Sequence, residues 1–123
     1  MPDELDGVLD RATLDALMDS LGGDAEFLAE LIDTYAADAP GQLEMLRMAL
    51  AAGDVAGLVR PAHTLKSSSA SLAALELAER CRQLETSAKA GSLEGANEAI
   101  EAIAAELDRV VSALEHTKES YPA

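Results

Sequence analysis

The histidine at position 63 is the residue whose type and surroundings could best support chemistry. It stands in the run AHTLKSSSASLAALELAERCRQLE, residues 62–85, with Lys66 three positions later. On a helix Lys66 lies one turn away, where its charge disfavours a second cation and keeps the imidazole neutral and nucleophilic. The same lysine can pair with an anion formed on the ring. Ser67 and Ala70 share this face and are small enough to let another molecule approach.

The composition predicts one all-α domain. The chain has 123 residues, 2% aromatic residues and no Trp, so its core must be built from aliphatic side chains on helices. The single Cys81 cannot form an internal disulfide, and its position on an apolar stripe indicates a core residue.

Five amphipathic segments are expected, connected by short polar turns. Leucines at three- and four-residue spacing indicate a short helix over about 11–21, which Gly22-Gly23 ends. Four longer apolar stripes cover about 24–52, 54–72, 74–90 and 93–118. This pattern predicts an antiparallel four-helix bundle with a short N-terminal capping helix, in a single domain over 1–123.

Two aspartates and two prolines give more detail on where these predicted helices begin and bend. Asp24 and Asp54 stand where N-caps are needed. Pro40 should kink the first long helix, unless two helices in line replace it. Pro61 falls inside the second predicted helix, so we expect a tolerated bend near 57–61.

The charge excludes some classes of partner. A net charge of −14 opposes binding to nucleic acid or to an anionic membrane surface, both of which need clustered basic residues. Residues 60–89 nevertheless carry +2, which favours contact with an anion or an acidic partner. The first residues, MPDELDGVLD, contain no apolar stretch, so we expect a cytoplasmic protein.

Other site chemistries fit poorly. A metal-binding bundle needs Glu-x-x-His pairs, but Arg60 precedes His63 and Ala113 precedes His116 by three positions. The serines at 67–69 have no evident base and orienting group, so they are interpreted as small residues at helix contacts. No nucleotide-binding loop is present in the sequence, and His116 is expected to be solvated.

The run from His63 onward resembles the histidine phosphotransfer (HPt) domain. The family pattern is His, any residue, Leu or Ile, Lys, Gly or Ser, then small residues, and the likeness extends over about 24–119. It implies a carrier, not an enzyme, that passes a phosphoryl group between aspartates of receiver domains in two-component signalling. His63 would be the phosphorylated residue and Lys66 would stabilise the phosphoryl charge.

The resemblance also implies the remaining site residues and partners. Ser67 holds the place where a large side chain would block docking, and Lys89 resembles a basic position directed at the same site. Arg60, Val59 and Ala70 share the face of His63 and are expected to contact phosphate or partner. The expected partners are response-regulator receiver domains and a hybrid sensor kinase, with the protein a monomer. No cofactor is expected, since magnesium would belong to the receiver.

One departure and two alternatives stay open. Ala73 replaces the glycine that the family usually has at the turn between the second and third bundle helices, so we expect this turn to differ slightly in geometry. The chain could instead be an adaptor that docks receivers without carrying phosphate. It could also be an HPt domain excised from a hybrid or chemotaxis-type kinase.

Overall fold

The computed structural model describes residues 8–120, which form α-helices and one 3-10 turn and contain no strand. The elements are α1 (Arg11–Ser20), α2 (Ala25–Ala51), η1 (Ala56–Leu58), α3 (Val59–Ser71), α4 (Leu75–Lys89) and α5 (Ala96–Ser120). The predicted all-α fold is therefore confirmed. The predicted helix ends differ from the observed ones by a few residues, most at the starts of α3 and α5.

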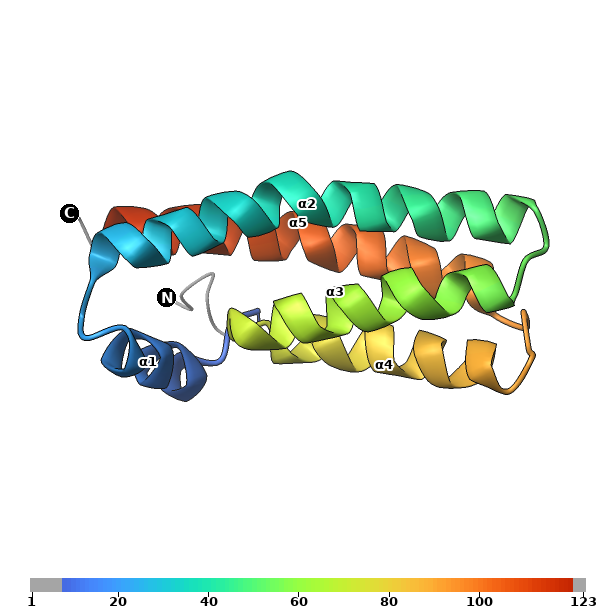
Figure 1. The fold of residues 1–123 in the computed structure, drawn as a ribbon, viewed down its shortest axis with the longest axis horizontal. Coiled ribbons are helices and arrows are strands. Elements are labelled where there is room, and N and C mark those ends of the chain that lie inside the picture. Colours follow the sequence, from blue (N-terminus) through green and yellow to red (C-terminus); the bar gives the residue numbers. More distant parts are fainter. Residues whose placement is uncertain (1–7, 121–123) are drawn as a thin grey trace.

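The four longer helices form an antiparallel bundle. α2 packs on α5 and α3, and α4 packs on α3 and α5, so the helices close a ring in chain order. Figure 1 shows α2 and α5 side by side as one long pair, α3 and α4 as a shorter pair, and α1 at the end where α2 begins and α3 ends. The largest fully buried side chains come from all of these helices: Leu14, Leu28, Ile32, Leu46, Leu58, Leu65, Leu77, Ile100, Ile103, Leu114, Glu106 and Val110.

Local signals in the sequence set the helix starts. Asp10 caps α1 by accepting the Thr13 amide at 3.0 Å, and Asp24 caps α2 by accepting the Phe27 amide at 3.1 Å. The predicted Asp24 cap is confirmed. Gly22 takes a left-handed φ of 68°, which lets the chain reverse between α1 and α2.

The two prolines behave differently from each other. Pro40 lies inside α2, which is one helix of 27 residues, so two helices in line are not formed. Pro61 lies inside a helix, as predicted, but in the first turn of α3 and not in the interior of one continuous helix from 54. Residues 56–58 form a 3-10 turn and the α-helix begins at Val59, so Pro61 occupies the first turn, where its missing N–H needs no partner.

The start of α5 is also later than predicted. The amide of Glu94 donates to Ser92 Oγ at 3.1 Å, and Gly95 takes a φ of 72°. This hydrogen bond and this left-handed backbone angle hold residues 92–95 in a turn, so the helix begins at Ala96 instead of near 93.

The turn between α3 and α4 depends on Ala73. This alanine is fully buried and has a φ of 70°, a left-handed conformation that glycine adopts more readily. The amide of Ala74 donates to Ser69 O at 2.8 Å, and the amide of Asp10 donates to Ala73 O at 2.7 Å. Ala73 therefore makes the turn that the family usually builds with glycine, and it also links this turn to the start of α1.

We expect Ala73→Val to destabilise the protein by about 2 kcal/mol, because a β-branched side chain is strained at a left-handed φ. Thermal unfolding followed by circular dichroism should show a melting temperature lower by about 8 °C. Ala73→Gly is the control and should lie within about 1 kcal/mol of wild type, since relief of strain is offset by the lost methyl burial and added chain entropy. Equal stability of the valine variant and wild type would contradict this account of the turn.

Candidate functional site

The imidazole of His63 lies on the surface of α3 and faces α4. Its side chain is 57% exposed, so the ring can be reached from solvent. The ring is nevertheless fixed on one side, because its Nδ1 lies 2.9 Å from Oε2 of Glu85. One ring nitrogen is thus occupied by the protein.

Glu85 holds the site together from α4. Its side chain is only 4% exposed, yet it meets three basic groups. Lys66 Nζ lies 2.9 Å from Oε1, while Lys89 Nζ lies 3.1 Å from Oε2, the oxygen that also contacts His63. We call His63, Lys66, Glu85 and Lys89 the Glu85 cluster.

The cluster keeps Glu85 ionised. The ion pair with Lys66 is the main cause that lowers the pKa of Glu85 from 4.5 to about 2, and Lys89 and His63 act in the same direction against the opposing effect of burial. An ionised carboxylate can only accept hydrogen bonds. The Nδ1 atom of His63 must therefore carry a hydrogen and donate a hydrogen bond to Oε2 of Glu85.

This assignment fixes the chemistry of the other ring nitrogen. In a neutral imidazole with a proton on Nδ1, the Nε2 atom carries a free electron pair. The exposed part of His63 thus presents a nucleophile to solvent, with two lysines held beside it by the same carboxylate. The arrangement suits attack on an electrophile whose negative charge the lysines can neutralise.

Of the seven predicted site residues, three lie in the cluster. His63, Lys66 and Lys89 all contact Glu85. Within residues 8–120, no hydrogen bond or ion pair joins the side chains of the other four to the cluster. Arg60 and Ser67 are exposed on α3, whereas Val59 and Ala70 are partly buried on the same helix.

Sequence reasoning missed Glu85 as a site residue and counted it only as one acid of the basic segment. A signal was present, because Glu85 lies on the buried stripe of α4 between Cys81 and Ala88, with Lys89 one turn later. An acid on a buried stripe needs basic partners, and these come from both its own helix and α3.

The other side chains considered in the sequence analysis are not part of the Glu85 cluster. Cys81 is fully buried, and burial raises the pKa of its thiol to about 12, which fits the predicted core role. Ser69 is also buried, where it pairs with the Tyr35 hydroxyl at 2.8 Å. His116 is exposed on α5.

Residues 8–120 contain no group of three or more side chains suited to hold a metal ion, and none of their helices is long and apolar enough to cross a membrane.

Comparison with known proteins identifies the family. Residues 30–113, most of the chain, match the family model described as the Hpt domain. The chain belongs to the Hpt domain family. This chain is also similar to a solved structure, the crystal structure of histidine-containing phosphotransfer protein B (HptB) from Pseudomonas aeruginosa PAO1. The two share 32% sequence identity over 94% of this chain and 98% of that one, with a TM-score of 0.84. No curated protein sequence matches this chain.

These matches establish the general function of the Hpt domain, which is histidine phosphotransfer in a phosphorelay. Proteins of this family are phosphotransfer carriers, not kinases, and they interact with receiver domains. The resemblance predicted from the run that begins at His63 is thereby confirmed at the level of family and fold.

We expect Glu85 to contribute to stability in a pH-dependent way. Its pKa is lower in the folded protein than in the unfolded chain, so its contribution is complete above about pH 4.5 and is lost as the pH falls toward 2. Glu85→Gln should therefore unfold at a lower temperature than wild type near neutral pH, and the difference should shrink between pH 4.5 and 2.

Thermal melts at a series of pH values test this expectation. Glu44→Gln, a change at an exposed glutamate of α2, is the matched control and should follow wild type throughout. A gap between wild type and Glu85→Gln that stays constant from pH 6 to pH 2 would show that the carboxylate charge is not stabilising.

Proposed function

We propose that His63 is the residue of this Hpt domain that accepts and donates the phosphoryl group. The observation that carries the proposal is the contact of Nδ1 with buried Glu85, which leaves an exposed Nε2 with its electron pair free. The phosphoryl donor and the final acceptor are aspartates of receiver domains.

The step is an in-line displacement at phosphorus. The Nε2 electron pair forms the N–P bond while the bond from phosphorus to the aspartyl oxygen breaks and returns its electrons to the carboxylate. The Nδ1 proton stays on the ring beside Glu85, whose negative charge stabilises the positive charge that the ring acquires. Because the transition state is loose, catalysis depends mainly on alignment and on charge neutralisation.

Lys66 and Lys89 supply the positive charge on the side of the carrier. Both ammonium groups pair with Glu85 in the free protein, and their long flexible stems allow each to turn toward phosphoryl oxygens at the neighbouring ring. Lys66 is 31% exposed and Lys89 is 62% exposed, so Lys66 acts in the less screened environment.

The surface around His63 admits the receiver. Ser67 and Ala70 are small, and Arg60 and Val59 extend the same face of α3 as contacts for the partner.

The receiver supplies magnesium, and the chain itself needs no cofactor or nucleotide site. We infer that a hybrid sensor kinase delivers the phosphoryl group through its receiver and that the carrier acts as a cytoplasmic monomer.

We expect His63→Gln to abolish transfer, because it removes the nucleophile and retains size and polarity. The measurement is the initial rate of label transfer from a phosphorylated receiver, with helicity checked by circular dichroism. His116→Gln, at an exposed histidine of α5, is the control and should transfer at the wild-type rate. Normal transfer by folded His63→Gln would overturn the assignment, and receiver binding without label on wild type would indicate an adaptor.

The lysines should differ in their effects on the same rate. Lys66→Ala removes a charge-assisted contact of about 1 to 2 kcal/mol, which is a loss of roughly five- to thirtyfold. Lys89→Ala should cost less, because its ammonium group is more exposed. A wild-type rate for Lys66→Ala would remove the electrostatic part of the mechanism while leaving His63 as the acceptor.

A further inference from the structure

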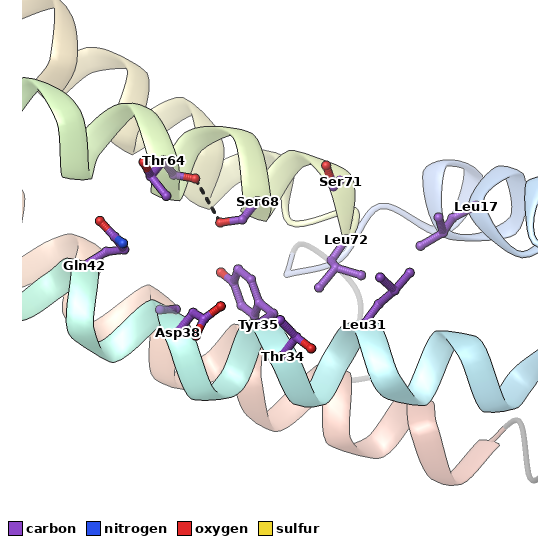
Figure 2. Close-up of a pocket in the computed structure, with 11 residues that line it drawn as sticks. Leu17, Leu31, Thr34, Tyr35, Asp38, Gln42, Thr64, Ser68, Ser71 and Leu72 are labelled. Carbon is purple, nitrogen blue, oxygen red and sulfur yellow. Dashed lines mark hydrogen bonds between the residues drawn. The ribbon is translucent and has the colours of Figure 1, made fainter.

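A second feature of the molecule lies on the opposite side of α3 from Glu85. A hollow of about 420 Å³ runs between α2 and α3 and reaches α1 at one end. Figure 2 shows side chains from these helices pointing into it, with Leu17, Leu31 and Leu72 at one end and Gln42 and Thr64 at the other. Its volume falls within the range of small-molecule sites, about 300 to 1,000 Å³.

The hollow has an amphipathic lining. Three leucines form its apolar end, and the buried ring of Tyr35 lies between that end and the polar one. Asp38 points into the hollow beside Tyr35 and is the one charged residue of the lining. Its side chain makes no hydrogen bond or ion pair with any residue from 8 to 120 in the structure, so its carboxylate stays available to a ligand.

Several hydroxyl hydrogens of the lining are already used within the protein. Ser68 Oγ donates to Thr64 O at 3.0 Å, and Ser71 Oγ donates to Ser67 O at 3.0 Å. These oxygens keep their electron pairs and can still accept hydrogen bonds. Together with the Asp38 carboxylate, which can only accept, these oxygens can hold a ligand that donates hydrogen bonds.

We propose that this hollow binds a small amphipathic amine, with its cationic group at Asp38 and its apolar part against Leu17, Leu31 and Leu72. The net charge of −14 favours the approach of a cation over that of an anion. Thr64 lines the hollow and directly follows His63 in α3, but the His63 ring faces Glu85 on the other side of that helix. The binding itself does not depend on the role of His63.

Amide NMR of the full chain tests the proposal with three probes of similar shape. They are the cationic 2-phenylethylamine, the neutral 2-phenylethanol and the anionic 3-phenylpropionate. The amine should produce saturable shifts at Thr34, Asp38 and Thr64, with a dissociation constant on the order of 1 mM for a ligand of this size. The alcohol should bind more weakly, and the acid should produce no saturable shifts.

Variants separate the hollow from general charge attraction. Asp38 is exposed, and Asp38→Asn should weaken binding of 2-phenylethylamine roughly fivefold, the upper range for an exposed ion pair. Glu44→Gln removes an exposed acid of the same helix outside the hollow and should bind as wild type does. Ser68→Leu should fill the hollow and abolish binding while helicity is unchanged.

Three results would overturn the proposal. They are the absence of saturable shifts with the amine, equal binding of the acid, or equal weakening by Asp38→Asn and Glu44→Gln. If a receiver domain perturbs these amides and the amine does not, the hollow belongs to the receiver interface and the proposal is wrong. Failure of phosphotransfer through His63 would leave the binding result unaffected.

Discussion

The contact between buried Glu85 and the exposed ring of His63 is the constraint on which the site depends. A carboxylate removed from water is costly unless it is paired, and Glu85 is paired with Lys66 and Lys89 as well as with the imidazole. The same three contacts that stabilise the carboxylate also fix the ring tautomer and hold both lysines near the imidazole. Loss of Glu85 would therefore affect folding and chemistry together.

The helical bundle brings the Glu85 carboxylate into contact with the His63 ring. His63 and Glu85 are 22 residues apart and come from consecutive antiparallel helices, so their meeting depends on the turn between α3 and α4. That turn requires a left-handed residue at position 73, and Ala73 adopts this conformation while the rest of α3 and α4 packs closely. α2 and α5 complete the core behind the pair, which leaves the outer face of α3 open to a partner.

Much of the fold could be predicted from the sequence because its signals are local. Leucine spacing, the Asp24 cap and the Gly22 turn each act over a few residues, and together they indicate the all-α bundle. The start of α3 was mispredicted because a 3-10 turn and an α-helix share the same early periodicity. The shift from one to the other becomes visible only in the hydrogen-bond pattern around Pro61.

The site was harder to predict because it depends on contact between two helices. The spacing of His63 and Lys66 within one helix suggested a nucleophile with a nearby cation, and the family resemblance indicated its role. The role of Glu85 required the relative rotation of α3 and α4, which side-chain packing decides. Lys89 was selected by family resemblance, and the structure supplies the physical reason for its position, a shared carboxylate oxygen with His63.

The position of the phosphoryl group on the imidazole tests this account most directly. Long-range proton–nitrogen correlation spectra of the phosphorylated protein distinguish the two ring nitrogens of His63. We predict phosphorus on Nε2 and a proton retained on Nδ1, where Glu85 accepts it. Phosphorus on Nδ1 of His63 would contradict the account, because that nitrogen could not then donate to Glu85.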